Sequence, residues 1–192
     1  MRASVGCLGP LTAARYRFDA HTQIGPSAHG RKTAPEGSKL GEGMHDAVTV
    51  HIAAPPRRIW AVVSDVTRIG TYSPETFEAE WLDGAAGPAA GARFGGHVKR
   101  NGKGPTCWTT CTVLDCVPGR EFAFGVGPGD RPLNVWRYQL EPIGDGTDVA
   151  ESFELAKTPM LRVYWALLGW VRGRSNRDGM RTALERVKAD VE

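Results

Sequence analysis

The chain has 192 residues, of which 41% are hydrophobic and 23% are charged, as is ordinary for a soluble globular protein of one domain. Its net charge of +3 arises within residues 1–43, which carry six basic and three acidic side chains, so residues 44–192 are neutral. A neutral body argues against a nucleic-acid reader, because phosphates are met by a basic face. The lack of an apolar run of about 18 residues argues against a membrane span, and we expect a cytoplasmic protein.

Residues 1–43 are expected to lie outside the folded domain. Residues 21–43 are dense in Gly, Pro, Ser, His and Lys and contain almost no large apolar side chains, so they cannot bury enough surface to become ordered. The first 20 residues lack the continuous apolar core of a signal peptide. We interpret residues 1–43 as a disordered leader or as an extension upstream of the true start, and residues 44–192 as the domain.

The domain is predicted to begin with a strand and a helix. Apolar residues alternate with polar ones over residues 48–52, and this period of two indicates a strand. Prolines at 55 and 56 end the strand and are tolerated at a helix start. Apolar side chains at helical spacing over residues 59–66 predict that helix.

Six further strands and a long helix are predicted after it. The strands cover residues 76–83, 92–100, 106–117, 121–126, 133–141 and 147–155. Glycine-rich turns separate them, including Asn101-Gly102, a strong hairpin signal. From Met160 onward the apolar period is helical, with an interruption at Gly173 and a final stripe from Met180 to Val191.

This order of elements resembles the START-like helix-grip superfamily (SRPBCC), and more narrowly the polyketide cyclase/dehydrase group of small bacterial proteins. The resemblance is carried by "VTVHIAAPPRRIWAVVSDVTRIGTYSPE", "GARFGGHVKRNGKGPTCWTTCTVLDCVPGREFAFGV", "VWRYQLEPIGDGTDVAESFEL" and "NRDGMRTALERVKADVE", which together span most of residues 44–192. It implies an α+β fold in which a curved antiparallel sheet of about seven strands wraps around a long C-terminal helix. It also implies a deep cavity between sheet and helix for a hydrophobic ligand.

Alternation within each strand predicts which side chains face that helix. The inward rows are Phe77/Ala79/Trp81, Phe94/Gly96/Val98, Phe122/Phe124/Val126 and Trp136/Tyr138/Leu140. For strand 106–117 both faces are plausible, with Trp108 and Thr110 on one and Cys107, Thr109, Cys111 and Val113 on the other. His97 is expected toward solvent. The residues expected to contact the ligand are Tyr72, Trp81, Phe94, Trp108, Phe124, Tyr138, Glu151, Trp165 and Met180.

Glu151 is the candidate catalytic residue. It shares a strand face with Val149, Phe153 and Leu155, where a carboxylate is costly unless it is paired or protonated. One interpretation is a pocket acid that orients a ligand hydroxyl or transfers a proton. The alternative is a rim position that returns the side chain to solvent.

Other chemistry-bearing residues show no functional spacing. The histidines lack metal-ligand spacing, and glycines 125–129 lack the following helix of a dinucleotide-binding loop, so we expect neither a metal nor a cofactor. Cys107 and Cys111 are about 13 Å apart along one strand, too far for a disulfide between them. We therefore expect four reduced thiols, as in the cytoplasm.

Three functions remain open from the sequence. The first is binding or transfer of a lipid or polyketide-like molecule, the second is a polyketide aromatase, cyclase or dehydrase, and the third is a chaperone-activator-like interaction module. With no strong catalytic constellation, binding is favoured, but a cyclase could still act by holding a flexible chain in one conformer. The basic residues of the last helix, interspersed with tryptophans, also allow peripheral contact with an anionic membrane surface.

Overall fold

The computed structural model describes residues 45–99, 105–127, 131–156 and 159–192, with side chains of the last segment from Arg174 onward. The expected leader, the Asn101-Gly102 turn and residues 128–130 lie outside the described residues.

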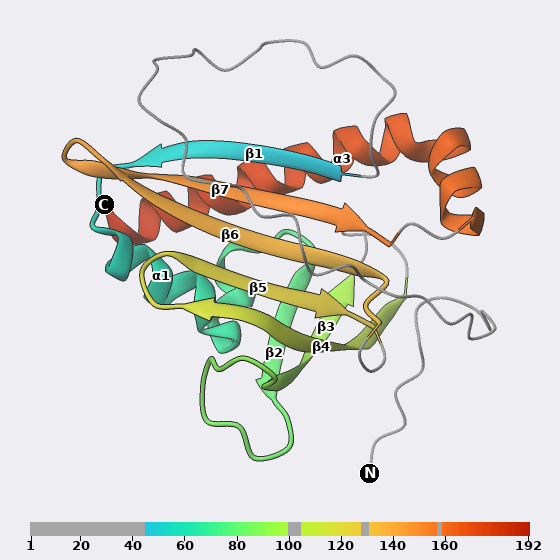
Figure 1. Ribbon diagram of the computed structural model, residues 1–192, viewed down its shortest axis with the longest axis horizontal. Helices are drawn as coiled ribbons and strands as arrows, with labels where there is room; N and C mark the ends of the chain where they lie inside the picture. Colours follow the sequence, from blue (N-terminus) through green and yellow to red (C-terminus); the bar gives the residue numbers. More distant parts are fainter. Residues whose placement is uncertain (1–44, 100–104, 128–130, 157–158) are drawn as a thin grey trace.

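The elements follow the predicted order of strand, helix, six strands and long helix (Figure 1). They are β1 (His45–Ile52), α1 (Pro56–Ser64), the 3₁₀ turn η1 (Val66–Arg68), α2 (Ile69–Tyr72), β2 (Thr76–Trp81), β3 (Arg93–Lys99), β4 (Thr106–Val117), β5 (Glu121–Val126), β6 (Asn134–Ile143), β7 (Gly146–Leu155) and α3 (Pro159–Val191). The turn η1 and helix α2 were not predicted. Helix α3 runs without a break through Gly173, so the expected interruption there was wrong.

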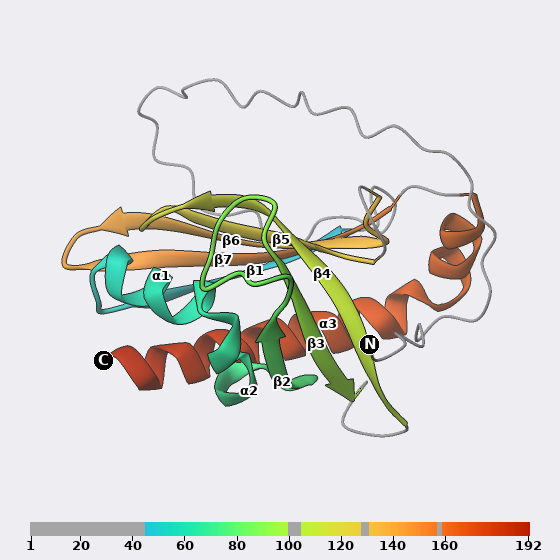
Figure 2. The same cartoon turned by 90° about the horizontal axis from the view of Figure 1, so that it is seen from below.

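The seven strands form one antiparallel sheet in the order β1-β7-β6-β5-β4-β3-β2. Strands β1 and β7, the first and last in the chain, are neighbours in the sheet, with His45 opposite Glu154. The sheet therefore brings together two segments that are far apart in the sequence. Figure 2 shows that the sheet curves around α3, with β2 and β3 descending beside the helix. Pro74, just before β2, lies 3.6 Å from the position that a Cβ on Gly179 of α3 would occupy. We call the sheet face toward α3 the concave face and the opposite one the convex face.

Helix α1 covers one end of this arrangement. It begins at Pro56, a position where the missing N–H costs no helical hydrogen bond, and it buries Ile59, Val62 and Val63. The following α2 approaches β2 so closely that a Cβ on Gly70 would lie 2.1 Å from the carbonyl oxygen of Phe77. Only glycine permits this contact, which fixes α2 against the edge strand.

The C-terminal part of α3 supplies the other side of the core. Its buried side chains recur every three or four residues and form one stripe: Met180, Ala183, Leu184, Val187 and Val191. The stripe packs in one apolar cluster with buried side chains of the sheet and of α1 and α2. This confirms the predicted final helical stripe and the α+β helix-grip architecture.

One predicted inward residue faces the wrong way. Phe77 was expected on the concave face with Ala79 and Trp81, but its side chain is 46% exposed and its ring contacts His97 at a centroid distance of 4.3 Å. The cause is a bulge between Thr76 and Glu78, which inserts a residue and reverses the alternation at Phe77. Among the described residues, no helix combines the length and apolar character needed to cross a bilayer.

Candidate functional site

Glu151 lies near the middle of β7 and points into the apolar interior. Its strand alternates buried and half-buried residues, and the buried set includes Val149, Phe153 and Leu155. The Glu151 side chain is only 3% exposed, so it does not occupy a rim position. A carboxyl group therefore sits between the hydrophobic side chains of Val149 and Phe153.

The two oxygens of Glu151 have different surroundings. The hydroxyl of Tyr138, the direct cross-strand partner on β6, donates a 2.9 Å hydrogen bond to Oε1. The other oxygen, Oε2, is buried and makes no hydrogen bond. A buried oxygen without a partner is costly, so Oε2 is an atom that an external partner would stabilise.

Burial controls the protonation state of this carboxyl group. Desolvation raises the pKa of Glu151 from 4.5 to about 8, and the Tyr138 hydrogen bond only partly opposes this change. The group is therefore mainly neutral near neutral pH, as an acid that carries a proton it can share or transfer.

Two buried tyrosines accompany Glu151. Burial is the main cause of a raised pKa at both Tyr72 and Tyr138, and the charge of Glu151 raises both further. Both phenols therefore stay neutral. The hydroxyl of Tyr72 donates to the carbonyl oxygen of Val63 at 3.3 Å, whereas only Tyr138 bonds the acid.

Three of the predicted ligand-contacting residues form a continuous aromatic row across neighbouring strands. Trp81 meets Phe94 edge-on at a centroid distance of 5.8 Å, and Phe94 meets Phe124 in the same way at 5.2 Å. Phe122 extends the row at 6.0 Å from Phe124. The inward prediction is correct for these rings, and Met180 of α3 is fully buried in the same cluster. The side chain of Trp165 lies outside the described residues.

A second aromatic contact lies directly beside the acid. Trp136 of β6 and Phe153 of β7 are cross-strand partners with ring centroids 4.9 Å apart. Asn134 continues the same β6 row, and its buried Oδ1 makes no hydrogen bond. Asn134 was not among the predicted site residues, although the alternation Asn134/Trp136/Tyr138 places it on this row.

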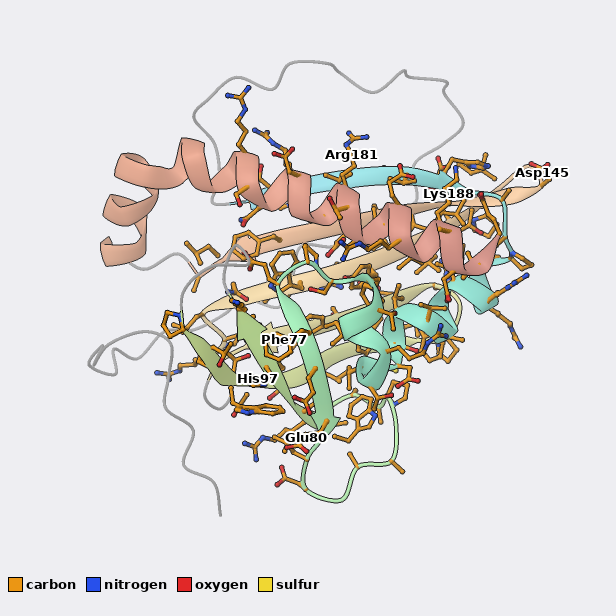
Figure 3. All side chains as sticks on the ribbon, turned by 180° about the vertical axis from the view of Figure 1, so that it is seen from behind. Phe77, Glu80, His97, Asp145, Arg181 and Lys188 are labelled. Carbon is orange, nitrogen blue, oxygen red and sulfur yellow. The ribbon has the colours of Figure 1, made fainter. Side chains whose placement is uncertain are left out.

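Trp108 does not belong to this interior. Cys111 pairs with the buried Phe94, which places the cysteine face of β4 inward and Trp108 on the convex face. There Trp108 stacks on His97 at a centroid distance of 4.6 Å. Phe77 also contacts His97, at 4.3 Å, and Figure 3 shows these two side chains near each other. The expectation that Trp108 contacts a ligand in the cavity is therefore wrong, while His97 is on the outer face as expected.

An open hollow of 370 Å³ lies away from Glu151. It is lined by Pro74, Glu75, Phe77, Lys99 and Thr106, at the edge of the sheet where β2 begins. Phe77, Lys99 and Thr106 belong to the convex side, since they lie in phase with His97 and Trp108. Because this hollow is open to solvent and Glu151 is buried among apolar side chains, we place the candidate site at Glu151 instead.

Three basic residues in the described part of α3 make contacts within the domain. Arg177 pairs with Asp46 of β1 at 3.6 Å, and Arg186 donates to the carbonyl oxygen of Tyr72 at 3.5 Å. Lys188 donates to the carbonyl oxygen of His51 at 3.0 Å, while Arg181 projects from the exposed side of the helix (Figure 3). Contact with a membrane surface stays a prediction.

The cysteines correct one expectation. Cys111 and Cys116 are free thiols, but Cys107 is disulfide-bonded, so not all four are reduced. Burial raises the pKa of Cys111 to about 12, which makes it a poor nucleophile. No group of three or more potential metal-binding side chains occurs within the described part of the chain.

Several solved structures share this architecture. TTHA0849 from Thermus thermophilus aligns with a TM-score of 0.57 at 19% identity, covering 77% of this chain and 96% of that protein. CV1439 from Chromobacterium violaceum aligns with a TM-score of 0.52 at 19% identity, covering 78% and 97%. Cgl2372 from Corynebacterium glutamicum, described as a Polyketide_cyc-like protein, aligns with a TM-score of 0.50 at 27% identity, covering 79% and 91%.

The family comparison extends over nearly the whole described region. Among curated proteins, none matches this chain. Residues 46–192 match the family described as "Polyketide cyclase / dehydrase and lipid transport", from β1 to the last residue. The chain therefore belongs to the polyketide cyclase/dehydrase and lipid transport family, with the helix-grip fold.

Proposed function

We propose that this protein binds a hydrophobic small molecule, a lipid or a polyketide-like compound, between the concave face and α3, as a binding or transfer protein. Family membership and fold support hydrophobic ligand binding in general. The aromatic rings of Trp81, Phe94, Phe124 and Trp136 supply the kind of apolar lining that such ligands require.

The single observation that carries the proposal is the unpaired Oε2 of Glu151. An interior that served only stability would be expected to have an apolar side chain here, since burying a carboxyl group is costly. In ligand pockets, a small number of polar groups among apolar side chains fix the orientation of the bound molecule, and Oε2 is available for this role.

The test combines co-purification with covalent mapping. Native mass spectrometry of the purified chain should show a bound apolar molecule, and the neutral dye Nile red should bind to the delipidated protein. An apolar probe with a photoreactive diazirine should then label peptides from β6, β7 and α3. Binding should also raise the melting temperature, because the ligand binds the folded state alone.

Two results would count against the proposal. A chain that purifies empty and binds no apolar probe has no such ligand. Labelling confined to Phe77 and Trp108 would move the binding site to the convex hollow. The variant Trp108→Ala separates these sites, because it should leave labelling of β6 and β7 intact.

A cyclase or dehydrase is the second candidate, and the neutral state of Glu151 favours it. With a pKa of about 8, this acid can donate its proton to a ligand carbonyl oxygen near neutral pH and recover it afterwards. The hydrogen bond from Tyr138 would stabilise the carboxylate that remains.

Enolisation of a bound ketone measures this chemistry directly. In deuterated water, Glu151 would protonate the carbonyl oxygen while a solvent molecule removes an α-hydrogen, and ketonisation would return a deuteron to that carbon. The protein should therefore accelerate exchange of the α-hydrogens of 2-dodecanone for deuterium, and Glu151→Gln should abolish the acceleration while the ketone still binds. If the wild-type protein bound the ketone without accelerating the exchange, this acid catalysis would be ruled out, and the protein would act only as a carrier.

A further inference from the structure

We propose that the site selects an uncharged apolar molecule that presents a carbonyl oxygen to Oε2 of Glu151, and that it discriminates against carboxylate lipids of the same length. This inference rests on the proposed function, because it names the chemical class of the ligand bound in the same interior. It follows from two features of the carboxyl group of Glu151: which of its oxygens already accepts a hydrogen bond, and which charged side chains lie near it.

The hydrogen bond from Tyr138 determines which oxygen of Glu151 carries the acid proton. A neutral carboxyl group has one O–H donor, and its other oxygen accepts. The Tyr138 hydroxyl already donates to Oε1, so the acceptor role belongs to that oxygen. The proton then resides on Oε2, which is the oxygen without a partner. Oε2–H is therefore a donor that needs an acceptor, and a ketone, ester or quinone-type carbonyl oxygen provides one.

The second step concerns charge. The cross-strand neighbours of Glu151 are Val48 on β1 and Tyr138 on β6. The side chains next to it on the same face of β7, Val149 and Phe153, are apolar and uncharged. The nearby titratable group from α2 is the neutral phenol of Tyr72. In the described part of the chain, no ion pair joins Glu151 to a lysine or an arginine: the bridges of Arg68, Arg93, Arg137, Arg177 and Lys188 go to other carboxylates.

An anionic ligand would consequently bring an uncompensated charge beside the acid. Burying such a charge without a cation is expensive, and the ligand would have to become protonated to bind. A cationic ligand would be held only if Glu151 were ionised, which its burial opposes. A neutral acceptor satisfies Oε2–H without either cost.

The experiment compares three probes of equal chain length by displacement of Nile red near neutral pH: 2-dodecanone, dodecanoate and dodecylammonium. We expect 2-dodecanone to bind at least about tenfold more tightly than dodecanoate, since a hydrogen bond is gained and a buried charge is avoided. Dodecylammonium should bind no better than dodecanoate.

Two substitutions locate the preference at Glu151. Glu151→Leu removes the donor and should weaken 2-dodecanone binding about tenfold without weakening dodecanoate. Glu151→Gln should keep ketone affinity within about threefold, because its amide N–H replaces the acid O–H as donor. The control Glu80→Gln makes the same change on the exposed convex side and should alter neither affinity (Figure 3).

The outcomes separate this inference from the function on which it rests. Dodecanoate binding as tightly as the ketone overturns the inference but leaves a hydrophobic ligand site in place. Tightest binding of dodecylammonium, lost in Glu151→Gln, overturns it too, because Glu151 would then act as a counter-ion. If neither Nile red nor any probe binds, the proposed function itself fails and the inference with it.

Discussion

Tyr138 and Glu151 are direct cross-strand partners of β6 and β7, and their side chains share a 2.9 Å hydrogen bond inside an apolar interior. One carboxyl oxygen is thereby satisfied and the other is not. The hydrogen bond therefore orients the acid but does not fully offset the free energy needed to bury it. The stability of the fold consequently depends on whether Glu151 is protonated.

The first prediction is that wild-type stability falls as the pH rises. Burial raises the pKa of Glu151 from 4.5 to about 8, so between these values the folded chain keeps a proton that the unfolded chain releases. The stabilisation by this group is fully present below pH 4.5 and is lost progressively as the pH approaches 8. Urea unfolding of wild type and Glu151→Gln across this range should show a difference that grows to at most about 5 kcal/mol.

The control for this measurement is Glu80→Gln, which should follow the wild-type curve because its side chain is exposed. Other acids whose pKa is raised by burial, such as the half-buried Asp46, change equally in wild type and variant, so the difference isolates Glu151. Parallel pH curves for wild type and Glu151→Gln would mean that Glu151 titrates as an ordinary surface carboxyl group.

The second prediction concerns Tyr138→Phe. Removing its hydroxyl leaves both oxygens of Glu151 without a donor, which should cost about 1–3 kcal/mol of unfolding free energy. Because this hydrogen bond lowers the pKa of Glu151, the pKa should rise further in the variant. Chemical denaturation and a ¹³C NMR titration of the Glu151 carboxyl carbon measure the two effects.

The variant Tyr72→Phe provides the matched comparison. Its hydroxyl donates to the carbonyl oxygen of Val63, so its removal should cost stability but leave the titration of Glu151 almost unchanged. Equal pKa changes in both variants would show that general packing, and not the Tyr138 hydrogen bond, controls the acid.

The order of elements and most inward rows could be predicted because alternation is a local property of the chain. Phe94, Phe124 and Leu140 are buried as their strands predicted. Phe77 could not be predicted correctly, because a bulge depends on the partner strand. The face on which Trp108 lies could not be predicted either, because it depends on the register between β3 and β4, which long-range hydrogen bonds determine.

The candidate site was predictable only in part for the same reason. The apolar row of β7 predicted an unusual environment for Glu151, and its burial agrees with that row. The donor for Oε1 was not predictable, because Tyr138 is opposite Glu151 only in the observed register of β6 and β7. The unpaired Oδ1 of Asn134 likewise depends on what packs above the row rather than on the row itself.

The third prediction tests the contact between α2 and β2. Gly70→Ala would place a methyl carbon 2.1 Å from the carbonyl oxygen of Phe77, so α2 must move away from the edge strand. We expect a loss of about 2–4 kcal/mol, in the range of overpacked or strained sites. Gly87→Ala is the control, since nothing lies within 4 Å of its Cβ position, and it should change stability little. Equal denaturation midpoints for both variants would contradict the tight approach of α2.

The last prediction compares two large aromatic side chains on opposite faces of the sheet. Trp136 packs against the core and contacts Phe153 on the concave face, whereas Phe77 is nearly half exposed on the convex face. Trp136→Ala should therefore cost about 3 kcal/mol, at the lower end for aromatic truncations because the ring is only partly buried. Phe77→Ala should cost less than about 1 kcal/mol, since it removes mainly its contact with His97. Urea denaturation with unchanged m-values measures both losses, and a reversed order would mean that the two faces have been assigned the wrong way round. Because Trp136 is also a proposed ligand contact, its loss should abolish the stabilisation by 2-dodecanone, which Phe77→Ala should retain.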